Sequence, residues 1–263
     1  MGEARMARVS NERNTMTMTP AAAETALRKQ NLPLGAELPG WQPPPAPAHA
    51  VLSGPRVHLE PLDAQRHSSM LHAAFAADAQ GAIWTYLPYG PFADARAYRD
   101  WTQTYVGLAD PMLFAIVEAV TGQPSGVAAY LRIDPRNGCI EIGHLAFAPS
   151  LQRTAAATEA LFLMLDHAFA LGYRRVEWKC NALNASSRRA AQRLGFSFEG
   201  VFRQAAVVKG RNRDTAWYAI LDTEWPVLRT AHVHWLADGN FDGYGRQRSA
   251  LADATRPLLA ARG

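Results

Sequence analysis

The chain is poor in cysteine, with only Cys139 and Cys180 among its 263 residues. So few thiols exclude a disulfide-stabilised scaffold and indicate a reducing compartment, in which we expect both to be buried and free. The eight histidines are scattered, and no Cys or His spacing matches a zinc site, so no metal is expected. With 48% hydrophobic residues, the chain is instead expected to be held together by an ordinary apolar core.

Long apolar runs are missing as well. No run approaches the ~18 residues of a membrane span. The first twenty residues contain arginines but lack the apolar centre of a signal peptide. We therefore expect a cytoplasmic protein with no membrane partner.

A strong excess of charge is also missing, since the formal net charge is only +4. The excess is uneven, because residues 184–213 contain one acidic side chain, Glu199, and the following basic ones: Arg188, Arg189, Arg193, Arg203, Lys209, Arg211 and Arg213. A solvated helix face and a nearby anionic ligand, such as a nucleotide phosphate, both explain this cluster. No recognised nucleic-acid-binding motif accompanies it, so nucleic acid is not expected as a partner. The oligomeric state stays open.

Composition divides the chain into four segments. Residues 1–31 are polar with little apolar periodicity and are expected to be disordered, and residues 32–52 form a Pro-rich arm. A folded domain is expected over residues 53–226, closed by Trp225-Pro226 at the end of its sheet. Residues 227–263 form a C-terminal extension with helix-like pieces around a Gly-rich turn.

Periodicity and turn residues predict an α+β domain in the order β-α-α-β-β-β-α-β-α-β-β. Strands are expected at 57–62, 112–119, 125–133, 139–147, 176–180, 197–208 and 213–223, and helices at 64–77, 94–108, 155–171 and 185–194. This order corresponds to an α+β arrangement with a mixed sheet. A hairpin turn is expected at Lys209-Gly210-Arg211-Asn212.

A short loop between a strand and a helix contains Gln152-Arg153-Thr154-Ala155-Ala156-Ala157. Free backbone N–H groups and the positive end of the helix dipole make such a loop suited to hold a phosphate. Further along, Asn184-Ala185-Ser186-Ser187 precedes a helix that closes with Leu194-Gly195-Phe196. Asn184 is suited to cap that helix and Gly195 to end it.

These loops and the order of the elements resemble the acyl-CoA-binding half of the GNAT N-acetyltransferases. Glu141-Ile142-Gly143-His144 resembles a strand of the branch that acetylates ribosomal-protein N-termini, the Rim type. The resemblance covers roughly residues 53–226. It implies a mostly antiparallel GNAT sheet and acetyl-CoA as the acyl donor, without a metal. The family glycine at position 155 is alanine here, which the backbone accommodates only if it is already helical there.

The resemblance also implies a cofactor site. Amides of residues 153–158 would bind the CoA pyrophosphate, with hydroxyl donors from Thr154 and Thr158, and the strand would hold the pantetheine and polarise the thioester oxygen. Asn184 would contact the pantetheine arm, and Ser187 would lie near the thiol end or the phosphates. The complete expected set is Leu145, Ala146, Phe147, Gln152, Arg153, Thr154, Ala155, Ala156, Ala157, Thr158, Asn184 and Ser187.

Glu141 is the expected general base, and His144 is the second candidate. Strand alternation places Glu141 and Gly143 on one face and Ile142 and His144 on the other, unless a bulge shifts the parity. The alternative for Glu141 is a structural ion pair with Arg132 or Arg174. The family's general-acid tyrosine is replaced by Ala191, so the general acid stays open.

The aromatic loop 84–92 is where the family closes over the acceptor. Trp84, Tyr86 and Tyr89 are expected to line that pocket, or else to pack helices onto the sheet, and Arg203, Lys209 and Arg211 would border it from the other side. The predicted function is direct acetyl transfer from acetyl-CoA to a primary amine, either a protein N-terminus or a small molecule. The alternative is a non-catalytic acyl-CoA-binding module or sensor.

Overall fold

The computed structural model describes Thr19 and residues 33–263. The prediction of a disordered segment over residues 1–31 therefore lies outside the described residues, apart from Thr19. The chain divides into two units, Met1–Gln42 and Pro43–Gly263. The larger unit starts ten residues before the expected boundary at 53, because Pro44 and Pro47 are already buried. The first unit's Leu34 and Leu38 are exposed.

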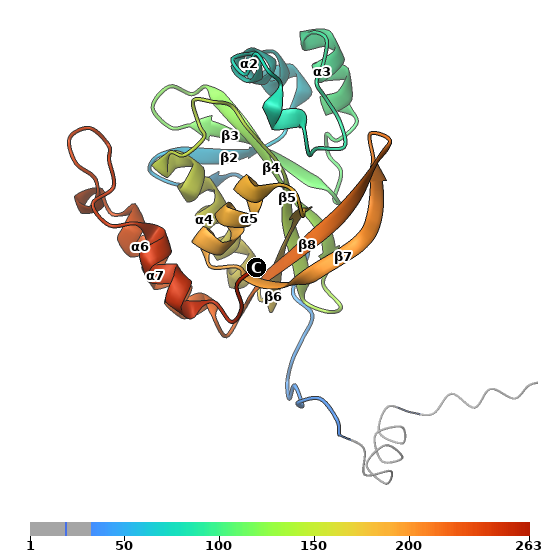
Figure 1. The fold of residues 1–263 in the computed structure, drawn as a ribbon, viewed down its shortest axis with the longest axis vertical. Coiled ribbons are helices and arrows are strands. Elements are labelled where there is room, and N and C mark those ends of the chain that lie inside the picture. Colours follow the sequence, from blue (N-terminus) through green and yellow to red (C-terminus); the bar gives the residue numbers. More distant parts are fainter. Residues whose placement is uncertain (1–18, 20–32) are drawn as a thin grey trace, which may run out of the picture. The chain divides into compact units, whose positions relative to one another are not determined.

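The larger unit is built on one eight-stranded sheet in the order β1-β2-β3-β4-β5-β6-β8-β7 (Figure 1). Every neighbouring pair is antiparallel except β5 and β6. This confirms the predicted α+β class and the mostly antiparallel sheet. The strands are β1 Leu52–Ser53, β2 Val57–Pro61, β3 Met112–Glu118, β4 Pro124–Asp134, β5 Cys139–Phe147, β6 Arg175–Asn181, β7 Ser197–Val208 and β8 Arg211–Leu221.

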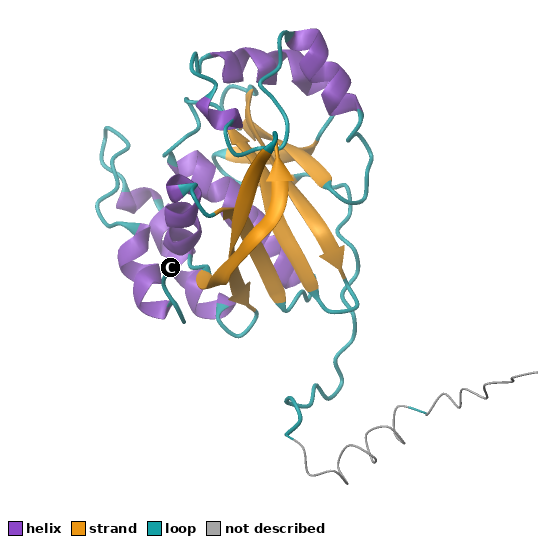
Figure 2. Ribbon diagram, turned by 45° about the vertical axis from the view of Figure 1, so that its right-hand side comes forward, coloured by secondary structure: helices purple, strands orange, loops and turns teal. Residues whose placement is uncertain are grey.

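The helices of the larger unit are α2 Ala64–Ala76, η1 Ala82–Trp84, α3 Ala95–Gln103, α4 Ala155–Ala170, α5 Ala185–Leu194, α6 Trp225–Leu236, η2 Asp238–Asn240, α7 Leu251–Thr255 and η3 Arg256–Leu258. After the two-residue β1, the predicted order is observed in full and is then followed by α6 and α7. Figures 1 and 2 show α4 and α5 beside the sheet, with α6 and α7 packed on their outer side, while α2 and α3 lie away from this group.

Two apolar cores cover the two faces of the sheet. Alternate residues of β3 divide between them, with Phe114 and Ile116 in the larger core beside α4 and Leu113 and Ala115 in the smaller core beside α2 and α3. Because both faces are covered, the strand is apolar along its whole length rather than in alternation.

The C-terminal segment belongs to the same core, contrary to the expected extension over 227–263. Trp225-Pro226 does not close the sheet, since β8 ends at Leu221 and Trp225 begins α6, with proline in its first turn. Trp225, Leu228 and Trp235 are buried in the larger core. The physical reason is that α6 carries its own apolar face, which packs onto α4.

Two other expectations need small corrections. The helix expected at 94–108 ends at Gln103. The hairpin between β7 and β8 has a two-residue turn, Lys209-Gly210, because Val208 pairs with Arg211. Both turn residues have positive φ, 49° and 71°, as a tight primed turn requires.

Candidate active site

The parallel strands β5 and β6 separate part way along their length. They pair at Cys139–Arg175, Ile140–Val176 and Glu141–Glu177, and within the described chain their pairing stops there. Beyond this point β5 follows β4 as far as Phe147, and β6 follows β8 as far as Asn181. We call this divergence the fork. It leaves the inner edges of the two strands without a strand partner.

A β-bulge in β5 lies just beyond the fork. Ala129 of β4 pairs with Gly143, but Val127 pairs with Ala146, so one extra residue is inserted and His144 has a φ of 51°. The bulge therefore takes His144 out of the strand alternation, which is the exception that the sequence analysis left open. Instead of facing the α4 side with Ile142, its ring stacks on Tyr89, which packs against the smaller core, at 5.6 Å between centroids and 5° between planes.

Glu141 is buried at the base of the fork, with 4% of its side chain exposed. Its Oε2 lies 2.6 Å from Nη1 of Arg132 and 3.0 Å from Nζ of Lys179. Burial raises the pKa of Glu141, and the two cations oppose this rise. The ion pair with Arg132, one of the two predicted alternatives, is therefore present. Arg174 is not among the ion-pair partners of Glu141 in the described residues.

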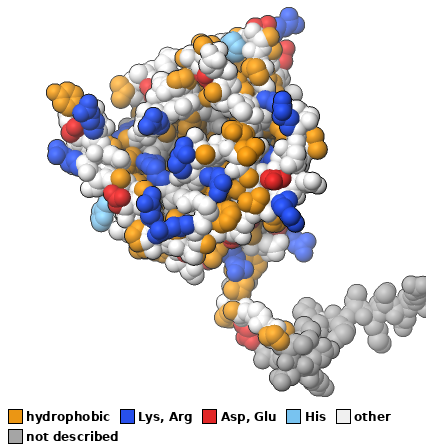
Figure 3. Space-filling view, in the orientation of Figure 1, with side chains coloured by type: hydrophobic (Ala, Val, Ile, Leu, Met, Phe, Trp, Pro, Cys, Tyr) orange, Lys and Arg blue, Asp and Glu red, His pale blue; other side chains and the backbone are white. Residues whose placement is uncertain are grey.

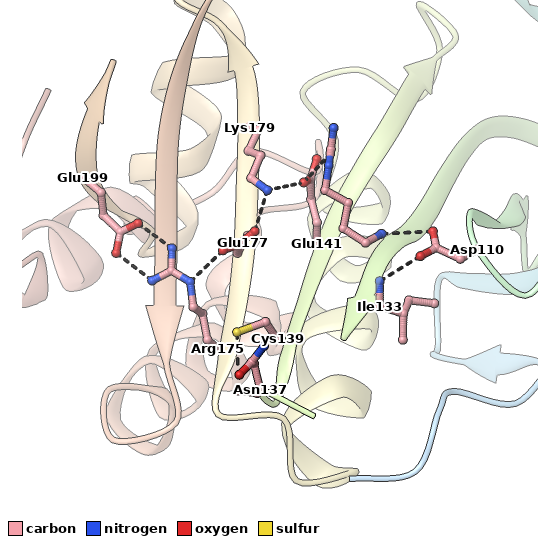
Figure 4. Close-up of polar contacts among 10 residues, drawn as sticks. Asp110, Ile133, Asn137, Cys139, Glu141, Arg175, Glu177, Lys179 and Glu199 are labelled. Carbon is pink, nitrogen blue, oxygen red and sulfur yellow. Dashed lines mark hydrogen bonds and ion pairs between the residues drawn. The ribbon is translucent and has the colours of Figure 1, made fainter. Parts of the chain in front are cut away.

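Lys179 is the residue that the sequence interpretation missed. Its ammonium lies 2.6 Å from Oε2 of Glu177 and 3.8 Å from the centre of the Trp217 ring. Glu177 in turn accepts from Arg175, which also binds Glu199 of β7. Figure 4 shows this series of alternating charges from Glu199 to Glu141. Together with Arg132 of β4 we call it the charge ladder, which consists of Glu199, Arg175, Glu177, Lys179, Glu141 and Arg132. The sequence does contain a signal for the β6 part of this ladder, because Arg175, Glu177 and Lys179 alternate with apolar residues and therefore share one face of the strand.

His144, the second candidate base, has one ring nitrogen engaged. Its Nδ1 lies 3.0 Å from the hydroxyl of Tyr89. Burial, followed by the nearby charge of Arg132, lowers the pKa of His144, and burial raises that of Tyr89. A neutral imidazole and a protonated phenol are therefore favoured at neutral pH, and such an imidazole can accept a proton.

The start of α4 presents three free amides. Thr154 caps the helix, with its hydroxyl accepting from the amide of Ala157 at 3.1 Å. The amides of Arg153, Ala155 and Ala156 have no partner within the described residues. Ala155 is the first helical residue, so its β-carbon is accommodated where the family pattern has glycine.

The side chains expected around these amides already have partners within the chain. Thr154 Oγ1 donates to the carbonyl of Leu151 at 2.7 Å. Thr158 is buried, and both terminal guanidinium nitrogens of Arg193 donate to its hydroxyl at 3.1 Å. Gln152 Nε2 donates to the carbonyl of Phe147 at 2.8 Å. In this structure the open donors of the loop are thus backbone amides rather than these side chains.

The remaining cofactor candidates lie on β5 and around α5. Asn184 caps α5 by accepting from the amide of Ser187 at 3.1 Å, and Ser187 accepts from Trp178 Nε1 of β6 at 3.0 Å. On β5, Ala146 is buried in the smaller core, while Leu145 and Phe147 are partly buried against the larger one. The cap that we expected for Asn184 is present, and α5 is tied to the β6 side of the fork.

The aromatic loop 84–92 has a mixed role. Trp84 is a core residue with 6% exposure and packs edge-on against Phe75 and Phe92, which is the packing alternative. Its carbonyl accepts from Lys209 at 2.8 Å, so the β7–β8 hairpin does reach this loop. The hydroxyl of Tyr86 donates to the carbonyl of Leu183 before α5 at 3.2 Å.

The basic cluster of residues 184–213 is only partly solvated. Arg188 donates to the hydroxyl of Tyr218 at 3.1 Å, and Arg193 donates to Thr158. Arg203 and Arg211 are exposed. Figure 3, which has the orientation of Figure 1, shows Lys and Arg side chains gathered over the middle of the face toward the viewer, where Figure 1 draws α5. This is compatible with both predicted explanations of the cluster.

Both cysteines are free, but only Cys180 is buried, and Cys139 is partly exposed because it begins β5 beside a turn. No three His, Cys, Asp or Glu side chains among the described residues are grouped so as to hold a metal ion. None of the helices that the structure describes has the length and apolar character needed to cross a bilayer.

Comparison with known proteins places this geometry in context. Residues 56–197 match the acetyltransferase (GNAT) domain family. A GCN5-related N-acetyltransferase from Brucella melitensis is 45% identical, with a TM-score of 0.81 over 83% of this chain and 100% of that one. A GNAT-family protein from Chromobacterium violaceum is also 45% identical, with a TM-score of 0.69 over 74% of this chain and 98% of that one. The ribosomal-protein-serine acetyltransferase of Escherichia coli is 34% identical over 101 residues, which are 38% of this chain and 56% of that protein.

Proposed function

The chain belongs to the acetyltransferase (GNAT) family, and from that premise we propose that it moves an acetyl group from acetyl-CoA to a primary amine by direct attack. The observation that carries this proposal is the trio of free amides on Arg153, Ala155 and Ala156 at the start of α4. Three N–H groups at a helix N-terminus suit the CoA pyrophosphate. These three amides are part of the range 153–158 that the sequence analysis expects to bind the pyrophosphate.

The fork is the second support for the proposal. Past Glu141, the inner edge of β5 has no strand partner among the described residues, so the pantetheine arm would run along this edge at Leu145, Ala146 and Phe147. Asn184 and Ser187 stand on the β6 side of the same opening, where α5 begins. The thioester would then lie near the bulge at His144, with backbone donors available to polarise its oxygen.

Glu141 is proposed as the general base. The acceptor nitrogen attacks the thioester carbonyl carbon, the C–S bond breaks, and CoA leaves as a thiolate. The proton lost by the nitrogen goes to Glu141 and from there to solvent, which returns a proton to the thiolate. A carboxyl whose pKa is raised by burial is a better base than an exposed one. His144 is the alternative base, because only its Nδ1 has a hydrogen-bond partner within the described residues. The step requires no metal and no acyl-cysteine.

The proposed acceptor is a protein N-terminus or a small-molecule amine, in the cytoplasm. The relative from Escherichia coli is named for a serine of a ribosomal protein, which favours a peptide N-terminus. Exposed Arg203 and Arg211, with Lys209 between them at the aromatic loop, favour an acidic acceptor.

One matched pair of variants tests the cofactor site. Ala155→Pro removes one free amide, yet proline is favoured at the first helical position, and the extended Thr154 before it is compatible with proline. Ala155→Gly keeps the amide. Calorimetric titration with acetyl-CoA should show about 10- to 100-fold weaker binding for the proline variant, the loss of one charge-assisted bond, and near-normal binding for the glycine variant. Equal affinities would remove the amide site from the proposal.

Incubation with acetyl-CoA and a panel of peptides and small amines, read by acceptor mass, tests transfer itself. Gain of one acetyl group on an amine supports the enzyme. Tight cofactor binding without transfer to any acceptor of the panel would favour the acyl-CoA sensor instead.

A further inference from the structure

The two carboxylate oxygens of Glu141 have different surroundings. Arg132 and Lys179 both bind Oε2, and Oε1 has no partner among the described residues. Oε1 lies beside Gly143, where an added β-carbon would stand 3.4 Å from it. Gly143 is partly exposed, although Glu141 is buried. Because Gly143 has no side chain, the Glu141 carboxylate is accessible from the side on which Gly143 lies.

The two cations that bind Oε2 also differ. Arg132 has 61% of its side chain exposed, so water screens its charge, whereas Lys179 has only 6% exposed. The ring of Trp217 covers the Lys179 ammonium, which spans the base of the fork from β6 to β5. Lys179 is shared with Glu177, which also binds Arg175. The charged groups around Glu141 are thus Arg132 on β4 and Lys179 with Glu177 on β6, with His144 further along β5.

We propose that Lys179 is a positioning residue, which holds the Glu141 carboxylate by Oε2 and leaves Oε1, beside Gly143, as the oxygen that accepts the proton of the acceptor amine. This inference rests on the proposed function. Of the two cations, Lys179 keeps the buried carboxylate ionised, because Arg132 is solvated. Glu177 weakens that hold by competing for the same ammonium.

The experiment is a carbon-detected NMR titration of the Glu141 carboxyl in the full-length protein, assigned by the signal that disappears in Glu141→Gln. Lys179→Met should move the midpoint of this titration upward by about 1 to 3 pH units, because an adjacent opposite charge is lost. Arg132→Met removes the exposed cation from the same oxygen and should move it less. An equal or smaller movement in Lys179→Met than in Arg132→Met would overturn the proposal.

A second variant covers the case in which Lys179→Met does not fold. Glu177→Gln leaves Lys179 to Glu141 alone and should move the midpoint downward, and an unmoved midpoint would contradict the proposal. This titration needs no turnover, so it is independent of whether the wild-type protein transfers acetyl groups.

Gly143→Ala tests the choice of oxygen in the active enzyme. Its β-carbon would stand 3.0 Å from Cδ2 of Leu131 and in van der Waals contact with Oε1 at 3.4 Å. This narrows the approach to Oε1, so transfer should fall about 10²-fold, the lower end of what one general base contributes, with the Glu141 midpoint and acetyl-CoA affinity nearly unchanged. Full transfer activity in Gly143→Ala would show that Oε1 is not the working oxygen.

Discussion

The two faces of β6 show how one strand serves two purposes. Val176, Trp178 and Cys180 point into the larger core with 5% exposure or less, while Arg175, Glu177 and Lys179 on the other face are the β6 members of the charge ladder. The apolar face gains its stability from area removed from water. The charged face costs desolvation, which the alternating ion pairs offset. Stability alone therefore poorly explains the charged face, whose last member, Lys179, binds the proposed base Glu141.

The largest expected effect on stability lies on the apolar face. Trp178→Ala should lower the free energy of unfolding by about 3 to 5 kcal/mol, because it empties a large buried site. Glu199→Gln, on the charged face, should cost less than ~1 kcal/mol, because Glu199 is 40% exposed. Urea unfolding of both variants at pH 7 measures the difference. Similar losses would mean that the ladder contributes to stability as much as the core does.

A fall in pH should lower the stability of the larger core through His232 of α6. This side chain is fully buried between α6 and α5, with Nε2 bonded to the carbonyl of Leu194 at 2.9 Å. Burial lowers the pKa of His232 to about 4 in the folded state, against ~6.5 in the unfolded chain. Between these values only the unfolded chain takes up the proton, so stability falls as the pH drops from ~6.5 to 4. The full loss is about 3 kcal/mol.

His232→Gln keeps a donor for the Leu194 carbonyl but cannot be protonated in this range. Unfolding free energies at pH 7 and pH 5 should therefore differ less in this variant than in the wild type. An unchanged pH dependence would assign the acid sensitivity to other groups.

The smallest effect is expected from removing residues 1–42. They form a unit of their own, and the elements of the proposed site all lie in the other unit. A chain beginning at Pro43 should bind acetyl-CoA within about twofold of the full-length protein, as measured by calorimetry. A much larger loss of affinity would place part of the cofactor site before Pro43.

Local signals predicted most of the fold. Asn184 caps α5 in the structure, as expected, and Gly195 ends this helix with a φ of 100°. Each of these features depends on a few neighbouring residues, so the sequence carries them directly. The strand-loop-helix unit at the start of α4 follows from the same kind of signal.

The features that were missed depend on long-range contacts. The ion pair of Lys179 with Glu141 needs the register of β5 against β6, which no short pattern encodes. The bulge that redirects His144 was left open as a possibility, because its presence is decided by pairing with β4. Trp225-Pro226 is predicted to close the sheet, yet Trp225 begins a helix that packs on α4.

The central claim is that Glu141 accepts the proton of the acceptor amine, and the pH dependence of transfer by Glu141→Gln tests it most directly. We predict a rate about 10²- to 10⁴-fold below wild type at pH 7 with nearly unchanged acetyl-CoA affinity, and a smaller deficit at high pH, where more of the amine is already neutral. A loss of rate, affinity and thermal stability together, without rescue at high pH, would instead make Glu141 a structural member of the charge ladder. A mild effect here with a large one in His144→Gln would assign the proton to His144.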